Sequence, residues 1–78
     1  MRQKELKALF TFPTTTAAMA MEDLCRREGL PGRLIPVPRS ITADCGMAWS
    51  APAVERRRLE EAVTAHGLTL SAVYELLL

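Results

Sequence analysis

Residues 33–39 read Arg-Leu-Ile-Pro-Val-Pro-Arg, a short apolar run with prolines at positions 36 and 38. The run predicts a strand over 33–37 that stops at Pro38. Because Pro36 has no N–H to donate to a neighbouring strand, we expect this strand to lie at an edge of its sheet.

One strand and one helix are predicted upstream. Alternating apolar residues predict a strand over 6–12, in which Leu6, Ala8, Phe10 and Phe12 share a face. Apolar residues at three- and four-residue spacing predict a helix over 14–28, which Gly29 would end. Three hydroxyl groups are available to cap its first turn. They belong to Thr14, Thr15 and Thr16.

Downstream, the pattern predicts a loop, a strand, a helix and a final strand. The loop covers 39–45 and the strand 46–50. Pro52 suits the first position of a helix over 52–66. Its buried stripe would contain Val54, Leu59, Ala62 and Val63. Alternation over 68–76 predicts the last strand. Leu68, Leu70, Ala72, Tyr74 and Leu76 would share one face of it.

The predicted order β-α-β-β-α-β is the ferredoxin-like, split βαβ arrangement, an α+β fold. Its antiparallel sheet has the strand order 4-1-3-2, which places the second strand at an edge, as Pro36 requires. Residues 1–78 would form a single domain. Two helices would cover one sheet face and leave the other open for a homodimer or a docked partner.

Composition and motifs exclude several functions. Ten Lys and Arg residues against nine Asp and Glu give a net charge of +1, which offers no basic face for nucleic acid. No apolar run approaches the roughly 18 residues that span a membrane, so we expect a cytoplasmic protein. The two cysteines form no disulfide framework and lack metal-ligand spacing, and no cofactor motif is present.

Cys45 is the best candidate for a functional group, because it lies in a polar loop whereas Cys25 lies on the apolar stripe of the first helix. The topology would bring this loop to the start of the first helix. Free N–H groups there, together with Arg39, would stabilise a thiolate, and Gly46 would let a substrate approach closely. The plainer interpretation is an incidental loop cysteine, with Arg39 and the threonines acting only as caps.

Residues 33–48, with Cys45 followed by Gly46, resemble the selenium/sulfur (Se/S) carrier protein-like family of small bacterial proteins. The resemblance implies a carrier more than an enzyme. Cys45 would hold sulfur or selenium, received from a donor protein and passed to an acceptor protein. Pro38 and Arg39 would shape the entrance, and Ser40 would join the threonines in binding.

Two other functions remain open at this point. The domain could bind a ligand or a protein without chemistry, in which case Cys45 is incidental. It could also be a redox sensor that forms an intermolecular disulfide through Cys45. The choice between sulfur and selenium, and the oligomeric state, are not decided by the sequence.

Overall fold

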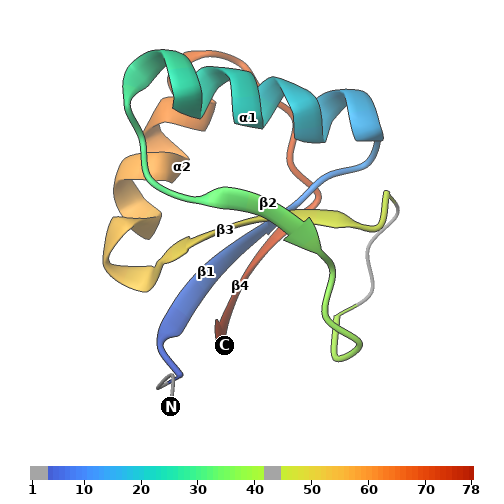
Figure 1. Cartoon of the computed structure of the whole chain (residues 1–78). Helices are drawn as coiled ribbons and strands as arrows, with labels where there is room; N and C mark the ends of the chain where they lie inside the picture. Colours follow the sequence, from blue (N-terminus) through green and yellow to red (C-terminus); the bar gives the residue numbers. More distant parts are fainter. Residues whose placement is uncertain (1–3, 42–44) are drawn as a thin grey trace.

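The computed structural model describes residues 4–41 and 45–78 of the chain. It is an α+β fold in which two helices lie on one side of a four-stranded sheet (Figure 1). The elements, in chain order, are β1 (Leu6–Thr11), α1 (Thr15–Glu28), β2 (Arg33–Pro36), β3 (Met47–Pro52), the 3-10 turn η1 (Ala53–Glu55), α2 (Arg56–Ala65) and β4 (Ala72–Leu77).

The strand order is β2-β3-β1-β4, and all three neighbouring pairs are antiparallel. This confirms the predicted order 4-1-3-2 and the edge position of β2. Pro36 is the last residue of β2 and lies opposite Met47. A proline at the end of an edge strand removes no hydrogen bond from the interior of the sheet.

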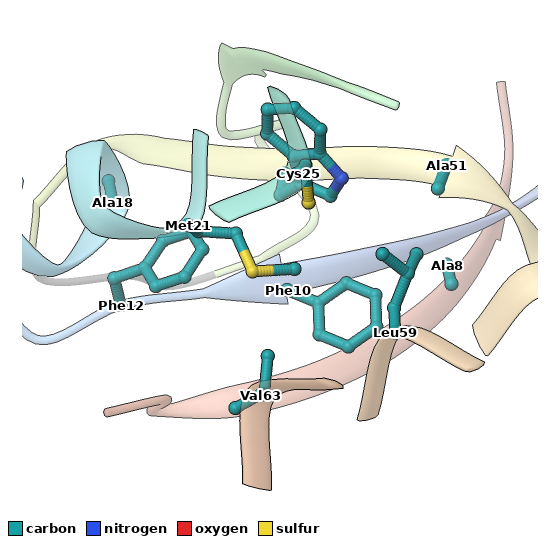
Figure 2. Close-up of a cluster of buried hydrophobic side chains, with 10 residues drawn as sticks. Ala8, Phe10, Phe12, Ala18, Met21, Cys25, Ala51, Leu59 and Val63 are labelled. Carbon is teal, nitrogen blue, oxygen red and sulfur yellow. The ribbon is translucent and has the colours of Figure 1, made fainter. Parts of the chain in front are cut away.

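The core lies between the sheet and the helices. Phe10 of the central strand β1 lies opposite Trp49 on one side and Val73 on the other. Side chains directly opposite each other in a sheet point to the same face, so these three face the helices. Figure 2 shows Phe10 and Phe12 packed among side chains of α1 and α2. The labelled helix residues are Ala18, Met21, Cys25, Leu59 and Val63.

Helix α1 is capped at both ends as its sequence predicts. The Thr14 hydroxyl accepts a hydrogen bond from the Ala17 N–H at 3.1 Å, so the helix begins at Thr15. Gly29 ends it in the left-handed conformation, with φ 66°. There a glycine avoids the clash that a Cβ would cause.

The second helix differs from its prediction at its start. Pro52 is extended, with ψ 139°, and is the last residue of β3, opposite Lys7. The chain then makes the short turn η1, and α2 begins only at Arg56. Val54 therefore lies in the turn and is 89% exposed, so its place in the buried stripe was wrong, while Leu59 and Val63 are buried as predicted.

The last strand is shorter than predicted, and Leu68 and Leu70 do not share a face with Tyr74 and Leu76. β4 begins at Ala72, and Leu68 and Leu70 pack against the core from the preceding loop. Val73 lies opposite Phe10 on the helix face, so Tyr74 faces the open side. The predicted alternation is therefore interrupted before Ala72, because the loop does not keep the two-residue period of a strand.

Candidate functional site

The two thiols occupy different environments. Cys25 lies on α1 within the core, where it is 1% exposed. Burial raises the pKa of its thiol from the ordinary value of 9.0 to about 11, because the interior disfavours the charged thiolate. Cys25 therefore stays protonated near neutral pH and acts as an apolar side chain.

Cys45 is half-buried and lies two residues before β3. Its side chain packs against the margin of the core cluster. The thiol donates a weak hydrogen bond to the carbonyl oxygen of Met47, with the sulfur and the oxygen 3.4 Å apart. This hydrogen bond joins residues only two positions apart, and it holds the sulfur next to the start of β3.

Gly46 follows the thiol and has a φ of 76°, in the left-handed region that glycine favours. Among the described residues other than its two chain neighbours, no heavy atom lies within 4 Å of the position that a Cβ would occupy. Its carbonyl oxygen accepts a hydrogen bond from the Val37 N–H at 3.0 Å, which closes the hairpin between β2 and β3.

The tip of the hairpin begins with a tight turn. The Ile41 N–H donates to the Pro38 carbonyl oxygen at 3.0 Å, which places Arg39 and Ser40 at the exposed centre of the turn. The Ile41 side chain is buried and anchors the turn. Residues 42–44 of the predicted loop 39–45 lie outside the described residues.

The threonines at the start of α1 lie at the same end of the sheet as the hairpin (Figure 1). Thr14 and Thr16 line a hollow of ≈ 410 Å³ together with the loop residues Gly67, Leu68 and Thr69. Within residues 4–41 and 45–78, no hydrogen bond joins Cys45 to Arg39 or to these threonines. The close clustering of the predicted site residues therefore stays a prediction.

Gly32 and Trp49 form a structural contact that the sequence did not single out. A Cβ on Gly32, whose φ is 121°, would collide with the Trp49 indole and lie 2.7 Å from the Ser50 carbonyl oxygen. The indole N–H donates to the Pro31 carbonyl oxygen at 3.1 Å. The Pro31-Gly32 pair before β2 could have predicted this contact, because a Pro-Gly pair marks a turn and glycine lets the backbone lie close to a neighbouring side chain.

A second hollow lies on the open sheet face, away from Cys45. It has a volume of ≈ 670 Å³ and is lined in part by Lys7, Arg33, Ile35 and Ser50. Lys7 is paired with Glu5, with the nitrogen and oxygen 3.2 Å apart.

The described part of the chain offers neither a metal site nor a membrane-spanning helix. No group of three or more His, Cys, Asp or Glu residues there could hold a metal ion. None of its helices is long and apolar enough to cross a membrane.

The fold and the site define a small α+β protein with one accessible thiol beside a left-handed glycine. The family model described as "Putative Se/S carrier protein-like" matches residues 7–75. The chain therefore belongs to the Se/S carrier protein-like family. Comparison with curated proteins and with solved structures found no match.

Proposed function

We propose that the protein carries sulfur or selenium on Cys45 between a donor protein and an acceptor protein. One observation supports this assignment above the others. Of the two thiols, Cys25 is buried and has its pKa raised to about 11, whereas Cys45 is partly exposed. Family membership supports the same role, because the family is named for carriage of these elements.

The transfer needs only thiolate chemistry. The Cys45 thiolate attacks the outer sulfur of a persulfide on the donor protein, a new S–S bond forms, and the donor leaves as a thiolate. The outer sulfur keeps its proton, so Cys45 becomes Cys–S–SH. An acceptor thiolate then attacks that outer sulfur, and Cys45 leaves as a thiolate. A donor that holds Cys–S–SeH delivers selenium by the same exchange. The carrier itself needs no cofactor.

The hairpin supplies room for this exchange. Gly46 has no side chain beside the thiol, and among the described residues other than its chain neighbours none lies within 4 Å of its Cβ position, which would let a second protein's sulfur approach. Pro38, Arg39 and Ser40 form the exposed turn of the same hairpin, and a guanidinium there attracts an anionic persulfide or selenide. A reducing compartment such as the cytoplasm would keep both thiols free.

Sulfur loading tests the proposal directly. The protein is incubated with a cysteine desulfurase and free cysteine, and its intact mass is measured. We expect the mass to increase by one sulfur atom, located on Cys45 by peptide mapping without reductant. Cys25→Ala should load like the natural protein, and Cys45→Ser should not load.

An unmodified Cys45 that is still alkylated by iodoacetamide would contradict the carrier role, because the thiol would then be accessible but inert toward persulfides. Sulfur found on Cys25 would contradict the assignment to Cys45.

Ligand binding is a second candidate function, and the ≈ 670 Å³ hollow on the open sheet face favours it. Arg33 beside Ile35 suits a small carboxylate with an apolar body, while Lys7 in the same hollow is paired with Glu5. NMR titration with butyrate and with benzoate should shift the amide signals of these residues equally in the natural protein and in Cys45→Ser. Shifts absent at millimolar ligand would remove this candidate.

A further inference from the structure

The two edges of the sheet are unlike. β2 has four residues and ends at Pro36, whereas β4 has six residues and contains no proline. Natural proteins protect sheet edges with prolines, charges or short strands, because an unprotected edge pairs with another strand. β2 carries such protection. The one charged side chain of β4 is Glu75, so its edge is open to pairing.

The hydrogen-bond pattern shows which backbone groups β4 offers. Glu5 and Leu78 exchange two hydrogen bonds of 2.9 Å, and the Thr11 hydroxyl donates to the Ala72 carbonyl oxygen at 3.2 Å. Along an antiparallel strand, the backbone N–H and C=O groups of successive residues point alternately toward the partner strand and away from it. The even-numbered residues of β4 therefore face β1. The odd-numbered residues direct their N–H and C=O groups outward, and these residues are Val73, Glu75 and Leu77.

Apolar side chains remain uncovered along this strand. Leu77 is 63% exposed and lies opposite Leu6, which is 46% exposed. Tyr74 and Leu76 are half-buried on the open face. A strand that paired with the outer edge of β4 would cover both sets of side chains.

We propose that β4 pairs antiparallel with β4 of a second copy of this chain, about a two-fold axis at Glu75. The strand is self-complementary about that residue. Val73 would lie opposite Leu77 of the second copy on the helix face, and Tyr74 would lie opposite Leu76 on the open face. Apolar side chains then meet apolar side chains, and the outward backbone groups bond each other.

Other registers fit less well. An axis at Tyr74 would place Leu77 against Ser71 and Val73 against Glu75 of the second copy. Only the Glu75 axis matches every apolar residue of the pair to another. This axis would place the Glu75 carboxylates of the two copies opposite each other, and like charges in that position repel.

Arg56 offsets that repulsion. Its guanidinium Nη1 lies 2.8 Å from a Glu75 carboxylate oxygen within each copy. Each Arg56 also pairs with Glu60, with Nε and the carboxylate oxygen 3.5 Å apart. The two guanidinium groups would therefore reduce the repulsion between the two Glu75 carboxylates that meet at the axis. The pairing lies on the far side of β1 from β3, so it is independent of the chemistry proposed for Cys45.

Sedimentation velocity over a concentration series tests the pairing. The natural protein should show a reversible monomer–dimer equilibrium. Leu77→Pro should raise the dimer Kd about tenfold or more, because the proline removes an outward N–H from each copy while the bonds to β1 remain. Leu77→Lys should weaken the dimer similarly. Met19→Lys, at another exposed apolar residue (59% exposed), is the matched control and should leave the Kd unchanged.

Circular dichroism checks that each variant keeps its fold. A natural protein that stays monomeric at its highest soluble concentration would overturn the proposal. So would a dimer that both Leu77 variants leave intact and Ile35→Lys abolishes, since the open face would then be the interface.

The axis has a test of its own. Arg56→Gln should weaken the dimer by leaving two carboxylates unneutralised, and the double variant Arg56→Gln/Glu75→Gln should restore it. Equal dimer Kd values in the natural protein and Arg56→Gln would overturn the Glu75 axis.

Discussion

At the scale of single residues, two glycines and two cysteines show how packing and the proposed site are separated in this protein. Gly32 lets the Trp49 indole pack directly against the backbone, and Gly46 follows Cys45 with a positive φ of 76°. Cys25 fills the core, whereas Cys45 lies at its margin. Gly32 and Cys25 therefore contribute to packing, and Gly46 and Cys45 belong to the proposed site.

Gly32→Ala should destabilise the fold by about 1–3 kcal/mol, because the added methyl group overlaps the indole and the Ser50 carbonyl oxygen. Urea unfolding measures the change. Gly67→Ala is the matched control. Its φ is also positive, at 66°, but no atom outside its chain neighbours lies within 4 Å of its Cβ position among the described residues, so it should cost only about 1 kcal/mol. Equal losses in the two variants would show that backbone conformation, and not the collision, determines the effect.

The raised pKa of Cys25 makes stability depend on pH. The folded protein keeps the thiol proton up to about pH 11, while the unfolded chain loses it near pH 9. This contribution to the free energy of unfolding is therefore present below about pH 9. It is lost as the pH rises toward 11, by at most about 3 kcal/mol.

Urea unfolding at pH 8 and at about pH 10.5 measures this loss, since the second pH lies inside the window that the raised pKa defines. Between these two pH values, the free energy of unfolding should fall more in the natural protein than in Cys25→Ala. Cys45→Ser should behave like the natural protein. Parallel falls in the natural protein and Cys25→Ala would contradict a pKa raised by burial.

At the scale of elements, the sequence predicted what local chemistry determines. The Thr14 cap, the left-handed Gly29 and Pro36 at an edge each follow from the properties of one residue, and all three are confirmed. The errors occurred where tertiary pairing decides. Pro52 suits a helix start as well as a strand end, and only its pairing with Lys7 selects the strand.

The same limit applies to β4 and to the site. Leu68 and Leu70 continue the alternation of the strand, although they belong to a loop that covers the core. The sequence identified Cys45 as lying outside an apolar stripe, and the structure places it at the core margin. The sequence alone could not show that Thr14 and Thr16 border the loop over 67–69, because these two segments are about fifty residues apart in the chain.

At the scale of the whole molecule, the thiol and the free edge are separated. Cys45 precedes β3, and β4 lies beyond β1. The rate at which iodoacetamide alkylates Cys45 should therefore be the same in dilute protein and in protein concentrated enough to pair through β4. Peptide mapping after timed quenching measures this rate. Slower alkylation at high concentration would place the interface over the thiol.

Pro36 also limits how far such an assembly can grow. A sheet with two open edges would add copy after copy and become a fibre. Here the two-fold pairing uses the β4 edge of both copies, and the outermost strands are then two copies of β2, each closed by its proline. Under the proposed pairing, the addition of further copies would therefore end at two subunits, because each outermost β2 ends in Pro36.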